Sequence, residues 1–160
     1  MTLLKTARFN LRTLTKADAT IRYLSWFNDK MSKQYIAYSS TSIDELSSYI
    51  ESKNASTACL LLGIFHGNEH IGNIKYEPIS YITGEATMGI LIGDPQWRGK
   101  GVASEVITAS ASYLKKNHST KVIILGVDTR NHSAIKSYEK LGFKTFKTKG
   151  QGIFMHWSLI

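Results

Sequence analysis

The chain has 160 residues, of which 42% are hydrophobic and 20% are charged. A chain of this size and composition can bury the core of one globular domain, which we take to span residues 1–160, without metal or disulfide cross-links. The single cysteine excludes a disulfide framework within the chain. The first residues lack a signal-peptide pattern, and the apolar runs are shorter than the roughly 20 residues that span a bilayer. These features predict a soluble, cytoplasmic protein.

The net charge of +8 is concentrated in the second part of the chain. Residues 1–97 carry nine Lys or Arg and nine Asp or Glu, whereas residues 98–160 carry eleven and three. A basic surface indicates an anionic partner, and nucleic acid, an anionic membrane or a phosphorylated cofactor would each qualify. A basic surface that meets only solvent is the simpler alternative.

The first third of the chain alternates between strand and helix signals. Apolar and polar residues alternate over 9–14 and predict a strand. Two capping-box sequences, at 15–18 and 42–45, predict helix starts, and a short helix is expected between them at 31–35. The residues expected to face the core from the two capped helices are Ile21, Leu24, Phe27, Leu46 and Ile50.

The rest of the chain has the pattern of a sheet interrupted by two helices. The expected strands cover 57–66, 69–77, 85–92, 121–127, 143–147 and 153–159. The first two of these form a hairpin around Gly67 and Asn68. Helices are expected at 102–116 and 133–141, and Gly142 ends the second. This order of elements predicts a mixed α/β sandwich.

The loop from Gln96 to Gly101 joins a strand to a helix and has the features of an anion site. Gly99 and Gly101 allow the backbone to curl tightly, and the helix start exposes amide N–H groups. Arg98 and Lys100 add positive charge, so a diphosphate is the natural occupant. The loop is shorter than a P-loop and lacks the third glycine of a dinucleotide fingerprint. A Gly-x-Gly also occurs in ordinary strand–helix turns.

Two spaced motifs resemble those of the GNAT acetyltransferase superfamily. The segment 96–103 is similar to its acetyl-CoA motif, Gln/Arg-x-x-Gly-x-Gly/Ala. About 30 residues later, the segment 131–143 resembles its second signature, Asn-x-x-Ala-x-x-x-Tyr-x-x-x-Gly-Phe. The resemblance covers nearly the whole chain. It implies the GNAT fold, a mixed central sheet with a splay between two parallel strands and helices on both faces.

Further segments are similar to particular groups within that superfamily. The opening residues 9–14, with Asp18 and 26–29, resemble the branch that contains ribosomal-protein N-terminal acetyltransferases. Residues 71–76 resemble GNAT proteins linked to surface-polysaccharide sugars. The resemblance therefore leaves the acceptor of the acetyl group open.

The resemblance also implies which residues hold acetyl-CoA. The pyrophosphate would contact backbone groups of Arg98, Gly99, Lys100, Gly101, Val102 and Ala103. The pantetheine arm would pair with the end of the preceding strand, at Leu91, Ile92 and Gly93. The thioester would enter the splay between this strand and 121–127, and Asn131 would contact the cofactor. We expect the basic excess of residues 98–160 to serve mainly this cofactor.

The reaction that the resemblance implies is attack of an amine on the thioester carbonyl. Tyr138 follows Asn131 by two helical turns, so both lie broadly on one side of a helix. The family places a tyrosine acid at this position, and a phenol with a pKa near 10 can donate to the departing thiolate. Packing of the ring is the alternative role. Glu85 is the first candidate for the general base, with Glu77 and an ordered water as alternatives.

Several partners and alternative functions stay open at this point. The acceptor amine could belong to a protein N-terminus, an amino sugar or a polyamine-like molecule, of which the last fits least because residues 1–97 are not net acidic. A catalytically silent acyl-CoA sensor and a basic nucleic-acid-binding module are the other functional classes. Recognised nucleic-acid motifs are absent. His66 and His70 have the spacing of a metal pair on a helix, but they flank a hairpin turn here. We therefore expect no nucleic acid, metal or membrane partner. A homodimer is left open.

Overall fold

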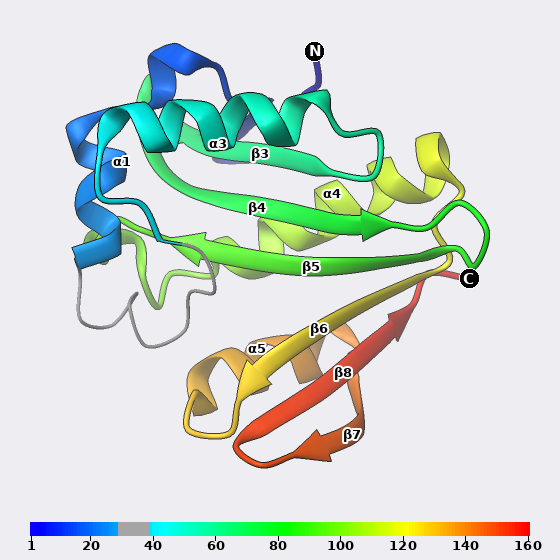
Figure 1. Ribbon diagram of the computed structural model, residues 1–160. Helices are drawn as coiled ribbons and strands as arrows, with labels where there is room; N and C mark the ends of the chain where they lie inside the picture. The colour runs from blue at the N-terminus through cyan, green and yellow to red at the C-terminus, as the bar shows by residue number, and fades with distance from the viewer. Residues whose placement is uncertain (29–38) are drawn as a thin grey trace.

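The computed structural model describes residues 1–28 and 39–160, and its centre is one sheet (Figure 1). The strands are β1 (Leu3–Lys5), β2 (Asn10–Thr13), β3 (Leu60–His66), β4 (Glu69–Ile79), β5 (Glu85–Ile92), β6 (Val122–Asp128), β7 (Lys144–Lys149) and β8 (Gly152–Ser158). The helices are α1 (Ile21–Ser25), α3 (Ile43–Ala55), α4 (Val102–His118) and α5 (His132–Leu141), with 3-10 turns η1 (Lys16–Asp18), η2 (Trp26–Asn28) and η3 (Pro95–Trp97). The helix expected at 31–35 lies outside the described residues.

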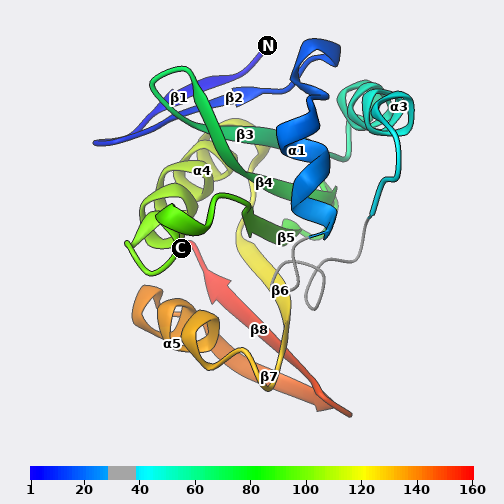
Figure 2. The same ribbon diagram turned by 90° about the vertical axis from the view of Figure 1, so that its left-hand side faces the viewer.

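The order of the strands across the sheet is β1-β2-β3-β4-β5-β6-β8-β7. Neighbouring strands are antiparallel except for β5 and β6, which run parallel. Figure 2 shows α1 and α3 on one face of the sheet and α4 with α5 on the other. The prediction of a mixed α/β fold with helices on both faces is therefore confirmed. In the described part of the chain, no helix is long and apolar enough to span a bilayer.

The parallel strands β5 and β6 are paired over only part of their length. Glu85 lies beside Val122 at the start of the paired stretch, and Met88 lies beside Leu125 at its end. Beyond this point β5 stays paired with β4, and β6 stays paired with β8. The expected splay is therefore confirmed. Backbone amide groups of both strands face the gap and need hydrogen-bond partners there.

Two layers of buried side chains hold the helices to the sheet. Fully buried members of the layer on the α4 face include Leu11, Leu62, Ile64, Ile74, Tyr76, Ile107, Leu114 and Ile123. The layer under α1 and α3 contains Leu14, Ala19, Tyr23, Trp26, Phe27, Leu46, Ile50, Leu61 and Phe65. Burial of a large apolar side chain contributes roughly 1.5–3 kcal/mol, so these layers supply the main stabilising force.

The start of α1 differs from the sequence prediction. The capping box at 15–18 opens only the turn η1. The helix itself begins after Thr20, whose hydroxyl accepts a hydrogen bond of 3.1 Å from the Tyr23 amide. This later start rotates the helix, so Ile21 is 79% exposed and Tyr23 is 2% exposed. The prediction that Ile21 faces the core was wrong, whereas Phe27 is buried as expected.

Two further local features bear on the sequence predictions. The cap expected at Ser42 is confirmed, because its hydroxyl accepts a hydrogen bond of 3.1 Å from the Glu45 amide. Strand β1 was not predicted, since three residues are too few to show an alternating pattern. It is held by pairing with β2, where Leu4 lies beside Leu11.

Candidate active site

The gap between β5 and β6 joins two clefts. The first has a volume of about 300 Å³ and is lined by the end of β5, the start of α4 and one side of α5. The second, of about 510 Å³, occupies the gap itself and extends over the end of β6 and the start of β8. Ile90, Asn131 and Tyr138 line both clefts, so these three residues mark the passage between them.

The second cleft reaches the face of the sheet that α5 does not cover. Along β8, Met155 is fully buried in the layer on the α4 face. Neighbouring residues of a strand point to opposite faces, so Phe154 points away from α4 and α5. Phe154 lines the second cleft. The first cleft, by contrast, lies against the two helices.

The loop before α4 forms an open cradle of backbone groups at one end of the first cleft. Gly99 has φ +70° and Gly101 has φ +74°, a conformation that glycine adopts without steric cost. A Cβ at Gly99 would meet no atom within 4 Å, and one at Gly101 would meet only Arg8 Nη2 at 3.7 Å. The amide of Glu105 donates to the Gly101 carbonyl at 3.3 Å, and the amides before it have no intrahelical acceptor. The cradle therefore fits a diphosphate.

Arg98 is tied to the end of β5. Its Nε donates to the carbonyl of Ile92 at 3.0 Å, and its Nη2 donates to the carbonyl of Gly93 at 3.3 Å. These bonds fix the exit of the chain from β5 into the loop. They also occupy the carbonyls of Ile92 and Gly93, so the free carbonyls that face the gap lie before Ile92. Leu91 and Ile92 line the first cleft.

Gly93 has a packing role that the sequence did not indicate. A Cβ on this residue would lie 2.0 Å from the indole ring of Trp26, closer than any side chain can approach. Trp26 belongs to the layer under α1. Gly93 thus lets the end of β5 pass directly beneath the indole, and it does not line either cleft.

A cluster of polar side chains ties the N-terminal turn to the cradle. Arg8 Nε forms an ion pair of 2.8 Å with Glu105, which lies in the first turn of α4. Arg8 Nη2 donates to the Lys100 carbonyl at 2.9 Å, and the Arg8 amide donates to Glu105 at 2.8 Å. The hydroxyl of Thr6 donates to the same carboxylate at 2.5 Å. The sequence analysis missed this cluster, because its partners are about 100 residues apart and follow no local pattern.

These contacts also set the charge state of Glu105. Partial burial opposes ionisation of the carboxyl. The hydrogen bonds from Thr6 and Arg8 outweigh this effect, so the pKa of Glu105 lies below its ordinary value. Glu105 therefore holds the turn as a carboxylate at neutral pH.

A second tie runs from α1 to the other end of the loop. Asp94 accepts a hydrogen bond of 2.9 Å from the Gln96 amide and forms an ion pair of 2.9 Å with Arg22 of α1. Arg22 also donates to the carbonyl of His70 on β4 at 2.8 Å. The loop is therefore held from both ends by side chains of the N-terminal part of the chain, and its amide groups are oriented in advance.

Asn131 and Tyr138 lie at the start of α5 and within it, and both line the two clefts. Asn131 precedes the helix, and its side chain accepts a hydrogen bond of 3.4 Å from the Ala134 amide. Tyr138 is 8% exposed, and burial raises the pKa of its phenol to about 12. Its ring packs on Phe143, with 5.7 Å between the ring centres. No described residue forms a hydrogen bond with its hydroxyl, which leaves the donor available at the passage between the clefts.

Glu85 is separated from the other candidate residues. It is the first residue of β5 and lies at the end where β5 and β6 are still paired. The gap opens only after Met88, three residues further on, which corresponds to about 10 Å along a strand. Glu85 is exposed and lines neither cleft. The position of Glu85 therefore does not fit a base acting at the gap. The sequence could not show this, because it does not reveal where the two strands part.

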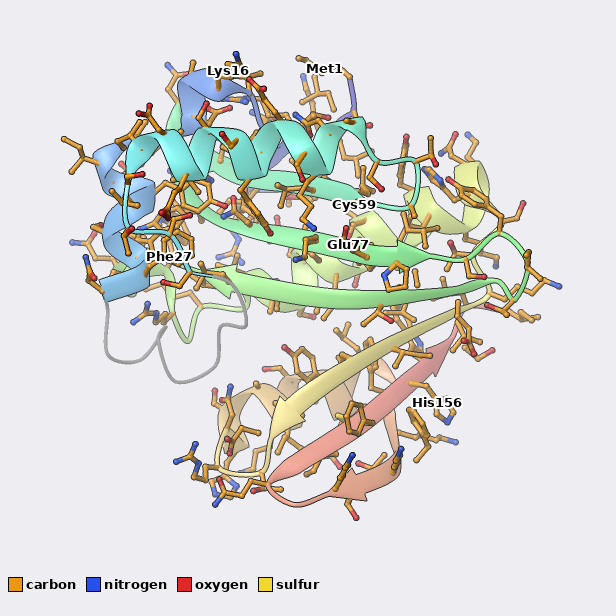
Figure 3. The ribbon with its side chains drawn as sticks, viewed as in Figure 1. Met1, Lys16, Phe27, Cys59, Glu77 and His156 are labelled. Carbon is orange, nitrogen blue, oxygen red and sulfur yellow. The ribbon has the colours of Figure 1, made fainter. Side chains whose placement is uncertain are left out.

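The alternative carboxylates also have other partners. Glu77 accepts hydrogen bonds of 2.7 and 3.0 Å from Lys53 of α3, and Figure 3 shows it on the α3 side of the molecule. Among the described residues that line the two clefts, Asp128 is the only carboxylate. A hydrogen-bonded ion pair with Arg130 lowers the pKa of Asp128 to about 2, so it is a weak base. No cluster of three or more His, Cys, Asp or Glu in the described ranges could hold a metal ion.

Comparison with known proteins identifies the family. The Acetyltransferase (GNAT) domain matches residues 8–144 of the chain. The chain belongs to the GNAT acetyltransferase family. An N-alpha-acetyltransferase of Saccharolobus solfataricus is 38% identical over 52 residues, which are 32% of this chain and only 31% of that relative.

Solved structures of other GNAT proteins share the fold. RimL, a ribosomal alpha-N-protein acetyltransferase solved with coenzyme A, has a TM-score of 0.88 and 14% identity, with 98% of both chains covered. The microcin self-immunity acetyltransferase MccE, solved with acetyl-CoA and AMP, has a TM-score of 0.83 and 16% identity, covering 96% of this chain and 93% of that one. A SpeG spermidine N-acetyltransferase from Vibrio cholerae has a TM-score of 0.80 and 23% identity, covering 95% and 94%. The neighbours differ in the acceptors that their names give, so the shared fold does not identify the acceptor.

The tie between Arg8 and Glu105 predicts a pH-dependent loss of stability in Glu105→Gln. We expect the free energy of unfolding of the variant to be about 1–2 kcal/mol lower than that of the parent at pH 7, because charge-assisted hydrogen bonds are lost. The lowered pKa of Glu105 means that its carboxylate stabilises the folded state above the unfolded pKa. This contribution disappears as the pH falls through the folded pKa, so the difference between parent and variant should shrink below about pH 4.

Denaturant unfolding at several pH values measures this difference. Glu139→Gln is the matched control, since Glu139 is exposed on α5 and forms no ion pair with a described residue. A difference for Glu105→Gln that is the same at pH 7 and at low pH would contradict a role for the ionised carboxylate.

Proposed function

We propose that this GNAT protein transfers the acetyl group of acetyl-CoA to the α-amine at the N-terminus of a protein or peptide. The observation that carries the proposal is the path from the backbone cradle, through the gap between β5 and β6, into a second cleft with Tyr138 at the passage. A donor that carries a diphosphate would enter from one side. An acceptor amine would enter from the other.

The first cleft suits the donor in shape and chemistry. Amide groups from Gly99 to Ala103 at the start of α4 would hold the pyrophosphate, assisted by the positive end of the helix dipole. The unpaired edge of β5 around Ile90, Leu91 and Ile92 would hydrogen-bond the amides of the pantetheine arm, much as a neighbouring strand does. The thioester would then lie in the gap.

Tyr138 is suited to protonate the leaving group. In the reaction, the acceptor nitrogen forms a bond to the acetyl carbon, and the bond from that carbon to sulfur breaks. The thiolate then needs a proton or a hydrogen-bond donor. A phenol with a pKa of about 12 remains protonated at neutral pH, and Tyr138 lines both clefts. Asn131 lines the same passage and would help to orient the donor.

Among the described residues, the two clefts offer only a weak base, which favours an α-amine over a lysine side chain as the acceptor. An amine attacks only in its neutral form, and the pKa of a free α-amine is near 8, against about 10.4 for lysine. At neutral pH, roughly a tenth of α-amines but fewer than about one in a thousand lysine side chains are neutral. Asp128, with a pKa of about 2, would deprotonate neither efficiently. An α-amine can lose its proton to water and needs little further help.

A panel of acceptor amines tests the choice of acceptor. The panel contains a peptide with a free N-terminus, the same peptide with a blocked N-terminus and an internal lysine, an amino sugar, and spermidine. We expect release of free coenzyme A with the first peptide only, and kcat/KM should rise with pH through the α-amine pKa near 8. Turnover with the amino sugar or spermidine, but not with the free peptide, would contradict the proposed acceptor. Coenzyme A binding without turnover on any amine would indicate a silent acyl-CoA sensor.

The cradle predicts that Gly101→Val loses coenzyme A binding. A valine side chain would project into the open space above the loop and block close approach of a diphosphate to the amide groups. Gly150→Val is the matched control, because Gly150 also has a positive φ, of +59°, and no atom within 4 Å of an added Cβ. Both variants carry the same kind of backbone strain. Calorimetry should show weaker binding by at least about tenfold in Gly101→Val alone, and equal binding in both would place the cradle elsewhere.

The position of Tyr138 predicts a slow but folded Tyr138→Phe variant. Phenylalanine keeps the ring that packs on Phe143 and removes only the hydroxyl. We expect unchanged coenzyme A binding and a fall in kcat of about 10²-fold, the lower range for general acid catalysis. Tyr113→Phe, which removes the hydroxyl of a half-buried tyrosine on α4, is the control and should keep full activity. Full turnover in Tyr138→Phe at saturating acetyl-CoA would leave Tyr138 as a packing residue only.

A further inference from the structure

A row of lysines lies on the face of the sheet where the second cleft opens. Strand β7 forms one edge of the sheet, and all its residues are exposed. In the register between β7 and β8, Lys144 lies beside His156, Lys147 beside Phe154, and Lys149 beside Gly152. Residues that alternate along β8 share one face, so the three lysines share the face of Phe154.

An irregularity in β7 is what brings these lysines to one face. The register shifts between Thr145 and Lys147, so one extra residue, Phe146, interrupts the pairing. In a regular strand, residues three apart point to opposite faces, and Lys144 would then face away from Lys147. Phe146 packs on His156, with 5.1 Å between the ring centres, which holds the bulge in place.

The lysines begin at the wall of the second cleft. The Nζ atom of Lys147 lies 5.8 Å from the ring centre of Phe154, and Phe154 and Gly152 line the cleft. Figure 1 views this face, with α5 behind the strands β6 and β8. On this face the lysines lie away from α4 and α5, against which the first cleft lies. The expectation that the basic excess of residues 98–160 serves mainly the cofactor stays a prediction, and the lysines of β7 favour a different partner.

The charge of this row is not compensated within the described part of the chain. None of Lys144, Lys147 and Lys149 forms an ion pair with a described residue. The nearest carboxylate along the register is Asp128, which lies beside Gly152 and is already paired with Arg130. Lysines also occur on edge strands because they prevent association of sheets, but that purpose does not require all of them on one face.

We infer that the second cleft accepts the N-terminus of an acidic peptide segment, whose carboxylates lie along Lys147, Lys144 and Lys149. This inference rests on the proposed function and narrows its acceptor. The row extends on the order of 15 Å along β7, the length of four or five extended residues. A peptide with its amine in the cleft crosses from β8 to β7 within about 5 Å, the spacing of neighbouring strands. A single phosphate group would engage only part of such a row.

The test compares peptides that differ only in charge. One peptide carries Asp or Glu at the positions after a free N-terminal residue, and its partner has the same N-terminal residue and carries Asn or Gln at those positions. With the parent enzyme, we expect a KM about tenfold lower for the acidic peptide and a similar kcat, because the lysines do not touch the reacting atoms. The triple variant Lys144→Gln, Lys147→Gln, Lys149→Gln should remove this preference. Raising the salt from about 0.1 M to about 1 M should also reduce it, since the screening length falls from about 10 Å to about 3 Å.

A matched variant separates the position of the lysines from net charge. The triple variant Lys5→Gln, Lys115→Gln, Lys116→Gln removes the same charge from exposed residues of β1 and the end of α4, and it should keep the preference. Anisotropy of a labelled, N-acetylated acidic peptide reports binding without turnover and should follow the same pattern. Equal KM values for acidic and neutral peptides, or equal effects of the two triple variants, would overturn this inference and leave the proposed function intact. Acetylation of no peptide at all, or of a nucleotide-linked amine only, would overturn both.

Discussion

The separation of β5 from β6 is the constraint on which the site depends. A strand that is paired on both sides offers no backbone group to a ligand. At the gap, β5 and β6 are each paired on one side only, so each has a free edge. β5 remains bonded to β4 as far as Ile92, and β6 remains bonded to β8 as far as Asp128. The sheet therefore stays intact on both sides of the gap, and the exposed edges are rigid. A flexible loop could not hold an extended donor with similar accuracy, because it would lose conformational entropy on binding.

The loop after β5 inherits its position from this gap, and side chains from the N-terminal part of the chain hold it there. Arg8 and Glu105 fix the start of α4, while Arg22 and Asp94 fix the other end of the loop. Both ion pairs are partly shielded from solvent, and their side chains also form hydrogen bonds with backbone groups. They therefore stabilise the loop more than isolated surface pairs would. The cost of ordering the cradle is met during folding. Ligand binding energy is then available for orienting the reactants.

The sequence predicted the features that depend on neighbouring residues. One such feature is the cradle at Gly99 and Gly101, which lies within a single turn. Another is the pair Asn131 and Tyr138, which belongs to one helix and its cap. In both, residue spacing determines geometry. It did not predict the Arg8–Glu105 contact or the indole over Gly93, since these join distant segments and have no periodic signal. The sequence also could not show that Glu85 lies away from the gap. The distance of Glu85 from the gap depends on where the strands part, and strand pairing is a long-range property.

The arrangement of charge follows the division of the sheet into two faces. Cradle amides and the start of α4 give one face a concentrated positive potential suited to a diphosphate, whereas the bulge at Phe146 gives the other face a linear row of lysines. A regular β7 would divide these lysines between the two faces of the sheet. The single extra residue therefore places all three on the face where the second cleft opens. For the α-amine proposed as the acceptor, control over which amine arrives, and at what orientation, would matter more than assistance to its deprotonation.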